Sequence, residues 1–240
     1  MSSLTLAPLV FLLLSCLVGF VIGGIPFGYL AGRLVLRDDI RNFGSGNIGA
    51  TNVGRVLGWN WGGVVLILDA LKGLVPTLAA ADAASDVLST EWVNHVAVAA
   101  GMSSIAGHMY PIYLRLRGGK GVATALGVVI VLAPTAVGIA LPVFVAVLIL
   151  SRRMALASML ASVTFGAAYL LLAGETAWTT PAASLTVFSV CVPLLIIWRH
   201  RSNIRRMIDG TEPALTDKVH SSCSDNESCA ADDSTRANDV

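Results

Sequence analysis

Long apolar runs alternate with short polar segments along most of this chain. Four of the runs are long, at 6–25, 62–81, 121–150 and 154–173, and two shorter ones follow the same pattern at 93–106 and 182–198. About 20 helical residues cross a bilayer core of roughly 30 Å. The pattern therefore predicts an all-α polytopic membrane protein.

The composition agrees with this prediction. Apolar residues make up 55% of the chain and charged residues only 13%, whereas a soluble domain is typically about a quarter charged. The first apolar run resembles a cleaved signal peptide in its position, but the basic start of such a peptide is missing, because the first arginine is Arg33. We therefore expect the first run to stay in the membrane as a helix.

The basic residues predict the topology. They gather in four loops, which contain Arg33, Arg37, Arg41 and Arg55; Arg115, Arg117 and Lys120; Arg152 and Arg153; and Arg199, Arg201, Arg205 and Arg206. The positive-inside rule places these loops in the cytoplasm. All four fall on one side only if 121–150 breaks near Ala133-Pro134, where proline disrupts a helix, and crosses the membrane twice. This reasoning predicts seven transmembrane helices, with the N-terminus outside and the C-terminus cytoplasmic.

The chain divides into two parts by composition. Residues 1–213 are expected to form a single membrane domain. Residues 214–240 contain six acidic and two basic residues and are rich in Ser, Asp and Ala, which is typical of a disordered acidic tail. The four cysteines form no Cys-x-x-Cys pair, so the sequence predicts neither a metal site nor a disulfide framework, and no motif indicates a cofactor.

One apolar run contains two ionisable residues. Asp69 and Lys72 are three residues apart and therefore share one helix face. Ionisable groups at membrane depth are candidates for a functional role. Two interpretations remain open, an internal ion pair and a contact with substrate, and the ion pair is favoured.

The first basic loop is rich in glycine and small polar residues. It contains Gly44-x-Gly46-x-x-Gly49, which matches the dinucleotide fingerprint in form, but no strand precedes it and no βαβ unit is present, so that function is excluded. Small residues allow backbone N–H groups to approach an anion closely. Gly46 with the side chains of Ser45, Asn47 and Thr51, followed by Arg55, therefore forms a candidate anion site, although a flexible turn between helices would show the same glycines.

The second basic loop contains Gly118-Gly119-Lys120-Gly121, directly before an apolar run. The N-terminus of a helix offers free N–H groups to a phosphate. The segment is not a Walker A motif, because Lys120 is followed by glycine and Leu114 stands where the upstream glycine is required. Lys120 is the candidate ligand, whereas a loop that only satisfies the positive-inside rule is the alternative. His108 is ambiguous, and a structural role is favoured.

The last basic segment contains His200 and Asn203, three residues apart and on one face if the preceding helix continues. The arginines of this segment would suffice to bind anionic lipid headgroups, at about 1 kcal/mol per cation. His200 and Asn203 add nothing to such a role, so they are candidates for substrate binding.

Together these segments resemble the PlsY family, the bacterial membrane glycerol-3-phosphate acyltransferases that use acyl-phosphate donors. That family carries Ser-Gly-Asn-x-Gly-Ala-Thr-Asn with a following Arg, then Gly-His-x-x-Pro with Gly-Gly-Lys-Gly, then His-Arg-x-Asn-Ile-x-Arg with Gly-x-Glu. All three motifs stand here in order, and the likeness covers about residues 25–212, including the Leu156-Ala157-Ser158 start of a later helix. The resemblance makes residues 1–213 a membrane acyltransferase domain.

The resemblance implies transfer of a fatty acyl group from acyl-phosphate to the sn-1 hydroxyl of glycerol 3-phosphate, giving lysophosphatidate and phosphate in phospholipid biosynthesis. It further implies a multi-pass protein of the bacterial inner membrane, with its site facing the cytoplasm, no nucleic-acid partner and a monomeric state. The implied catalytic residues are His200, Lys120 and Arg55. The implied substrate- and phosphate-binding residues are Ser45, Gly46, Asn47, Thr51, Gly118, Gly119, Gly121, Ser158 and Asn203.

Two questions of mechanism stay open in the sequence. Arg55 and Lys120 are expected to neutralise phosphate charge, whereas the proton of the attacking hydroxyl goes either to a substrate phosphate oxygen, which the resemblance favours, or to His200. The His-x-x-x-x-Asp motif of acyl-carrier-dependent acyltransferases is absent, because Tyr113 and Arg205 stand where its aspartate would be. A transporter for a phosphorylated solute and a passive lipid-binding scaffold are the rival functions. Polar residues in loops rather than at the bilayer midplane disfavour the first, and the glycine spacing disfavours the second.

Overall fold

The structure is a computed structural model that describes residues 3–215 and residue 217. Its described residues form α-helices joined by loops and short 3-10 turns. The α-helices are α1 (Ser3–Gly23), α2 (Phe27–Val35), α3 (Ala50–Leu57), α4 (Trp59–Ser85), α5 (Thr90–Met109), α6 (Val122–Leu132), α7 (Pro134–Ser151), α8 (Met154–Ala173), α9 (Thr180–Arg199) and α10 (Arg201–Ile208). The 3-10 turns are η1 (Ile40–Asn42), η2 (Ile112–Leu114) and η3 (Gly174–Trp178).

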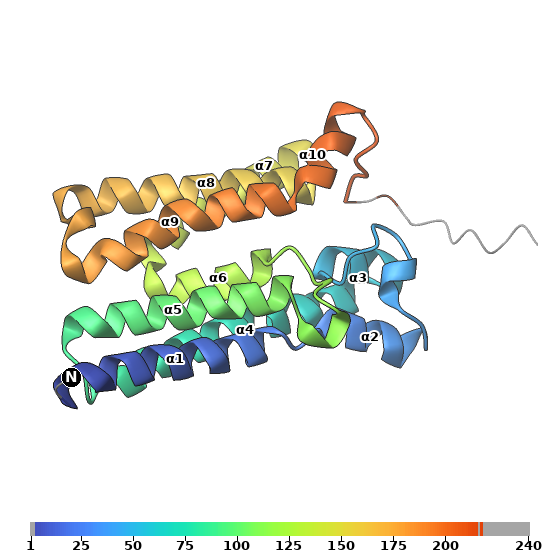
Figure 1. Cartoon of the computed structure of the whole chain (residues 1–240). Helices are drawn as coiled ribbons and strands as arrows, with labels where there is room; N and C mark the ends of the chain where they lie inside the picture. The colour runs from blue at the N-terminus through green and yellow to red at the C-terminus, as the bar shows by residue number, and fades with distance from the viewer. Residues whose placement is uncertain (1–2, 216, 218–240) are drawn as a thin grey trace, which may run out of the picture.

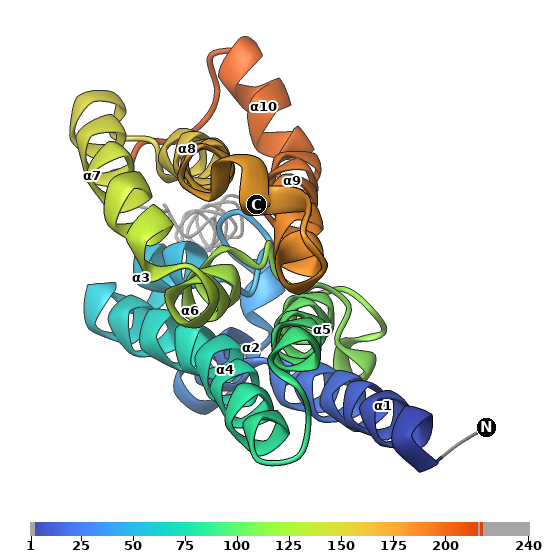
Figure 2. The same ribbon diagram turned by 90° about the vertical axis from the view of Figure 1, so that its left-hand side faces the viewer.

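The long helices form two layers. Helices α1, α4, α5 and α6 pack against one another in one layer, and α7, α8 and α9 form the other. The layers meet mainly where α5 packs on α9, with smaller contacts of α6 with α7 and α9. Seen along the helix axes in Figure 2, α4 and α6 face α7 and α8 across the layers. The described part of the chain shows no extensive packing of α4 on α7 or α8.

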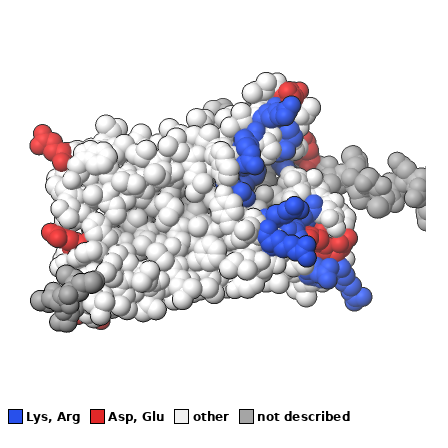
Figure 3. Space-filling model, in the orientation of Figure 1, with Lys and Arg blue, Asp and Glu red and all other residues white. Residues whose placement is uncertain are grey.

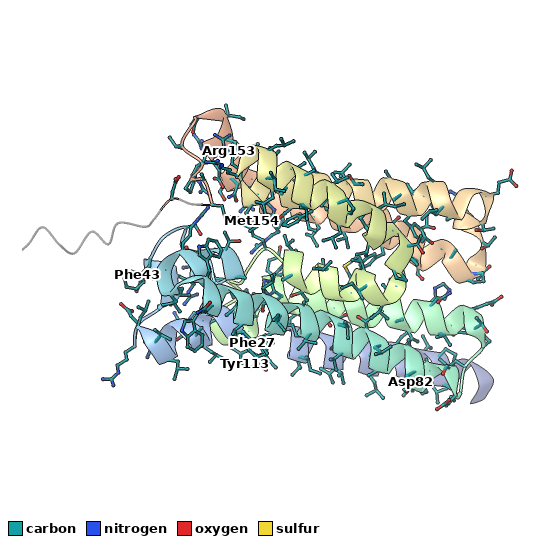
Figure 4. The ribbon with its side chains drawn as sticks, turned by 180° about the vertical axis from the view of Figure 1, so that it is seen from behind. Phe27, Phe43, Asp82, Tyr113, Arg153 and Met154 are labelled. Atoms are coloured by element: carbon teal, nitrogen blue, oxygen red, sulfur yellow. The ribbon has the colours of Figure 1, made fainter. Side chains whose placement is uncertain are left out.

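Charge separates to the two ends of the molecule. Lysine and arginine gather at the end that carries α2, α3 and α10, where acidic side chains lie among them, whereas the opposite end shows acidic side chains without basic ones, and the body between the two ends is almost uncharged (Figures 1 and 3). Figure 4 shows Arg153, Met154 and Phe43 at the basic end and Asp82 at the other. Large apolar side chains such as Leu13, Ile149 and Leu171 are exposed on the body. This surface is that of an integral membrane protein.

The prediction of seven transmembrane helices is wrong for the part of the chain that the structure describes. Five segments there are long and apolar enough to cross a membrane: Leu6–Val35, Trp59–Ser85, Pro134–Ser151, Met154–Trp178 and Thr180–Arg199. The fold is all-helical and membrane-embedded, as expected, but neither the count nor the topology derived from it holds.

The error lies in two helices. The predicted break is present, because α6 ends at Leu132 and α7 begins at Pro134. However, the 11 residues of α6 rise only about 16 Å, roughly half of a bilayer core. The second is α5, whose apolar run is interrupted by polar side chains such as Asn94, His95 and Ser104.

The end of the described chain packs against the basic end of the molecule. The Leu215 N–H donates to the Arg152 carbonyl oxygen at 2.7 Å, so this segment bridges to the loop between α7 and α8. Most of the predicted acidic tail, residue 216 and residues 218–240, lies outside the described residues.

Candidate active site

The loop before α3 is wound around the side chain of Asn52. The Asn52 Nδ2 group donates to the carbonyl oxygens of Asn47 at 2.8 Å and Phe43 at 3.1 Å, and its Oδ1 accepts from the Ser45 N–H at 2.8 Å. Gly44 and Gly46 have φ values of +59° and +69°, a backbone conformation that glycine adopts without strain. The buried amide therefore fixes the tight loop that holds the predicted residues Ser45 and Asn47.

The glycine-rich second loop lies flat on the end of α5. The Gly118 N–H donates to the Met109 carbonyl at 3.2 Å, and the Gly119 N–H donates to the His108 carbonyl at 3.1 Å. A Cβ atom on Gly119 would collide with the His108 ring. Two of the N–H groups expected to cradle a phosphate are thus paired with backbone, and the glycines serve to bring this loop close to α5.

Arg199 holds the same loop from the other side. Its Nη2 donates to the carbonyl oxygen of Gly119 at 2.6 Å and to that of Gly118 at 3.3 Å. Gly121, with φ of +82°, turns the chain into α6. Backbone hydrogen bonds and this arginine together fix the loop from which the Lys120 side chain enters the cavity.

Lys120 begins a chain of hydrogen bonds that crosses to the C-terminal segment. Its Nζ donates to Asn203 Oδ1 at 2.6 Å, Asn203 Nδ2 donates to Glu212 Oε1 at 2.7 Å, and Arg206 Nε donates to Glu212 Oε2 at 2.8 Å. Asn203 and Glu212 are both buried. Because the Asn203 carbonyl oxygen faces Lys120, the ammonium group is held in place while its remaining hydrogens stay available for an anion.

Burial alters the protonation of this cluster. Desolvation lowers the pKa of Lys120 to about 8, with the carboxylate of Glu212 opposing the shift and the guanidinium of Arg206 adding to it. Desolvation also lowers the pKa of His200 to about 4, and the positive charge of Lys120 adds to this shift. Near pH 7 Lys120 is therefore mostly cationic and His200 is neutral.

The tautomer of His200 follows from its hydrogen bond. His200 Nδ1 lies 2.8 Å from the Ile196 carbonyl oxygen, which can only accept a hydrogen bond. Nδ1 therefore carries the proton of the neutral ring, and Nε2 is left as an acceptor. Since His200 lines the cavity, it can accept a hydrogen bond from a ligand hydroxyl there.

Arg55 is the second cation at the site. One of its terminal nitrogens, Nη2, donates to the carbonyl oxygens of Pro213 and Ala214, each at 3.2 Å. Among the described residues its buried Nε has no hydrogen-bond partner. Burial lowers the pKa of Arg55, but a guanidinium stays charged near neutral pH. Because Arg55 also lines the cavity, its guanidinium can bind an anion there.

Asp69, Lys72 and His108 lie deeper between the helices. Lys72 Nζ lies 2.8 Å from Asp69 Oδ1 and also donates to the Ile25 carbonyl at 2.8 Å. His108 Nδ1 lies 3.6 Å from the same Asp69 oxygen. The buried ion pair anchors the link between α1 and α2, which is the favoured interpretation, although Asp69 and His108 also reach the cavity wall.

A single cavity of about 610 Å³ joins these groups. Eight of the twelve predicted site residues line it: Ser45, Asn47, Thr51, Arg55, Lys120, Ser158, His200 and Asn203. Gly46, Gly118, Gly119 and Gly121 do not line it and shape the loops behind it. The cavity has a polar part at the basic end of the molecule and a long apolar part between α6, α7, α8 and α9.

Two residues that organise this site were not predicted from the sequence. Asn52 stood in the first motif with no assigned role, and its central position depends on contacts that the tertiary fold creates. Glu212 stood in the last motif as one more polar residue, yet its buried carboxylate joins Asn203 to Arg206. The signal for Glu212 was a carboxylate soon after a cluster of arginines, although Asp209 shows the same feature.

Comparison with known proteins gives one consistent result. The family model described as glycerol-3-phosphate acyltransferase matches residues 13–210. A glycerol-3-phosphate acyltransferase of Myxococcus xanthus (strain DK1622) is 44% identical over 196 residues, covering 82% of this chain and 95% of that protein. One of Listeria monocytogenes serovar 1/2a is 40% identical over 204 residues, covering 85% of this chain and 96% of that protein.

Two crystal structures are also similar to this chain. PlsY, described as an integral membrane glycerol 3-phosphate acyltransferase, matches in its glycerol 3-phosphate form with a TM-score of 0.73 and 35% identity, over 85% of this chain and 94% of that one. Its lysophosphatidic acid form matches with a TM-score of 0.70 and 34% identity, over the same shares.

Proposed function

Since the chain belongs to the glycerol-3-phosphate acyltransferase family, we propose that it transfers a fatty acyl group from acyl-phosphate to the sn-1 hydroxyl of glycerol 3-phosphate. The products are 1-acyl-glycerol 3-phosphate and inorganic phosphate. The chain is thus an integral membrane acyltransferase of phospholipid biosynthesis. The identity of the donor and the position that is acylated are our proposal. The shape and charge of the cavity support this proposal.

The polar part of the cavity suits phosphorylated substrates. Lys120 and Arg55 both line it, and neither has a carboxylate within ion-pair distance among the described residues. Arg206, in contrast, is already paired with Glu212. Two free cations in a partly buried site match two phosphate groups, one on each substrate, and Arg can bind a phosphate by two parallel hydrogen bonds.

The apolar part of the cavity suits a donor with a fatty chain. It continues from the polar part along α6, α7, α8 and α9, with side chains such as Val129, Val137 and Phe165. An acyl-phosphate has the same arrangement, a charged head joined directly to a long apolar chain. The apolar side chains keep the fatty chain out of water, and each methylene kept from water is worth about 0.8 kcal/mol.

The chemistry requires positioning more than a strong base. The acceptor hydroxyl oxygen attacks the donor carbonyl carbon, the bond from that carbon to the phosphate oxygen breaks, and phosphate leaves with the bonding electrons. Acyl-phosphate is already activated, so holding the two substrates in line and stabilising the carbonyl oxyanion supplies much of the acceleration. The guanidinium of Arg55, which lines the same cavity, is suited to donate to the oxygens that gain charge.

The proton of the attacking hydroxyl goes to a phosphate oxygen in this proposal. The pKa of His200 is lowered to about 4, whereas the second pKa of a phosphate monoester is about 6. The phosphate oxygen is then the stronger base near pH 7. His200 is left with the role of accepting a hydrogen bond at Nε2 and orienting the hydroxyl.

We place the polar end of the cavity on the cytoplasmic side of the bacterial inner membrane. The lysine and arginine side chains that gather at this end support the placement, because positive charge marks cytoplasmic loops (Figure 3). Glycerol 3-phosphate is a soluble metabolite and would enter from there. The polar groups of the site come from one chain, so we take the monomer as the working unit.

Product analysis tests this function directly. The purified protein in lipid bicelles is given radiolabelled glycerol 3-phosphate and palmitoyl-phosphate, and the lipids are separated by thin-layer chromatography. We expect labelled lysophosphatidate from the unchanged protein and at least tenfold less from Lys120→Ala. In a parallel assay with the protein in sealed vesicles, label that enters the vesicles without entering a lipid would instead indicate a transporter. In bicelles, label that enters a lipid with palmitoyl-coenzyme A but not with palmitoyl-phosphate would exclude the acyl-phosphate donor.

A further inference from the structure

The apolar part of the cavity ends at a floor of side chains. Its farthest lining residues are Val129 on α6, Val137 on α7, Phe165 on α8 and Val192 on α9. Phe165 has the largest side chain of the four and is only 4% exposed. The four helices therefore close around the cavity at this level.

Packed core lies directly beneath this floor. Phe165, Val129 and Val192 belong to a buried apolar cluster that continues to Ala136, Ala168 and Phe188. Phe188 is almost fully buried. Because protein interiors are close-packed, this cluster leaves no continuation of the cavity below Phe165.

The floor is close to the polar residues. Ser158 and Phe165 both lie on α8 and both line the cavity. They are seven residues apart, so the ring of Phe165 is about two turns, or roughly 10 Å, below Ser158 along the helix axis. One leaflet of a bilayer core is about 15 Å thick. The enclosed part of the cavity is thus shorter than the chain of an ordinary membrane lipid.

The cavity is open at its side. Leu66 on α4 and Leu141 on α7 both line it and are 46% and 50% exposed. The two helices belong to different layers that do not pack closely here (Figure 2). Methylenes that do not fit above Phe165 must leave through this opening, where they contact bilayer lipid on one side.

From these observations we propose that Phe165 sets the preferred acyl-chain length of the enzyme. A methylene that is buried above the floor exchanges fluid lipid for close-packed side chains, and the added van der Waals contacts strengthen binding in the reacting complex. A methylene beyond the floor passes from the bilayer into an opening that faces the bilayer, so it adds little to the binding free energy. Catalytic efficiency should therefore rise with chain length and then level off or fall at the length that reaches Phe165. This inference rests on the proposed acyl donor.

Variants on one helix change the floor in opposite directions. Phe165→Ala deepens the enclosed space, and Phe165→Leu is a milder form of the same change. Ala161→Leu raises the floor, because Ala161 lines the cavity one turn nearer to Ser158. Val163→Ala is the matched control, because Val163 lies on the same stretch of α8, does not line the cavity and is 46% exposed.

The experiment is a competition between donors. Each protein receives glycerol 3-phosphate and an equimolar mixture of saturated acyl-phosphates that increase by two carbons, and mass spectrometry gives the distribution of lysophosphatidates. We expect Phe165→Ala to move the preferred length up by at least two carbons, because the enclosed space above the floor becomes deeper. Ala161→Leu should move it down, and Val163→Ala should leave it unchanged.

The outcomes separate this inference from the function itself. If the unchanged protein transfers no acyl group from any acyl-phosphate, the proposed donor is wrong. If it is active but active forms of Phe165→Leu and Ala161→Leu both keep its product distribution, Phe165 does not set the length. If Phe165→Ala fails to fold, the direction of the shift in Ala161→Leu decides, since that residue has space beside it: a downward shift upholds the inference, and no shift overturns it.

Discussion

Removal of the Lys120 ammonium group should weaken the use of glycerol 3-phosphate far more than its position in a basic loop suggests. Lys120 Nζ is held 2.6 Å from Asn203 Oδ1, and its side chain lines the cavity. Lys120→Ala removes a charge-assisted contact to phosphate, which is typically worth about 1.5–3 kcal/mol. That is roughly a tenfold to hundredfold loss of kcat/KM for glycerol 3-phosphate.

The assay measures initial rates against glycerol 3-phosphate at saturating acyl-phosphate. The loss should appear mainly as a raised KM, because a phosphate far from the breaking bond binds alike in the ground and transition states. Arg117→Ala is the matched control: Arg117 stands in the same loop but is exposed and does not line the cavity. It should change kcat/KM by less than about twofold.

Two results would refute this reasoning. One is a Lys120→Ala protein with an unchanged KM for both substrates and a reduced kcat, which would give Lys120 a role in the chemical step alone. The other is an equal loss in Arg117→Ala, which would make the effect one of general loop charge rather than of a site.

Three further predictions concern the hydrogen-bond chain and its protonation. His200→Gln should keep appreciable activity, because glutamine can still accept a hydrogen bond although it is not basic. If His200→Gln is as inactive as His200→Ala while binding glycerol 3-phosphate normally, the proton of the attacking hydroxyl does not go to a substrate phosphate. Because the pKa of Lys120 is about 8, its charge is present below that pH and lost above it, so kcat/KM for glycerol 3-phosphate should fall as pH rises through about 8; a profile that stays flat to pH 10 would contradict this. Glu212→Gln removes the buried negative charge that pairs with Arg206 and replaces one of the two accepting oxygens by a donor NH2 group. It should lower the free energy of unfolding by about 1–3 kcal/mol. Thermal unfolding in detergent measures this change, and a melting temperature equal to that of the unchanged protein would argue against a structural carboxylate.

The sequence predicted the membrane class and the break before Pro134 because both follow from local rules, the length of apolar runs and the effect of proline on a helix. It did not predict the number of spanning segments. Parity assumes that each apolar run crosses the bilayer fully, and α6 ends about halfway. Whether a short apolar helix crosses the bilayer depends on how it packs against neighbouring helices. The sequence of that one segment does not determine this packing.

The candidate site shows the same division. The sequence motifs that contain Arg55, Lys120 and His200 predicted a phosphate-binding site. The three side chains line one cavity. The state of the glycine loop could not be predicted, because the Gly118 and Gly119 N–H groups pair with carbonyls at the end of α5. The role of Glu212 likewise depends on tertiary packing, because Glu212 acts through Asn203, which meets Lys120 across 83 residues of sequence.

The central claim is that acyl transfer is coupled to the release of phosphate from the donor. Phosphorus NMR of the purified protein in bicelles, with acyl-phosphate and glycerol 3-phosphate, follows both phosphates at once. The account predicts that inorganic phosphate and 1-acyl-glycerol 3-phosphate appear in equal amounts and that neither appears without glycerol 3-phosphate. Phosphate release in the absence of glycerol 3-phosphate, or an acylated product formed while the acyl-phosphate signal stays constant, would contradict it.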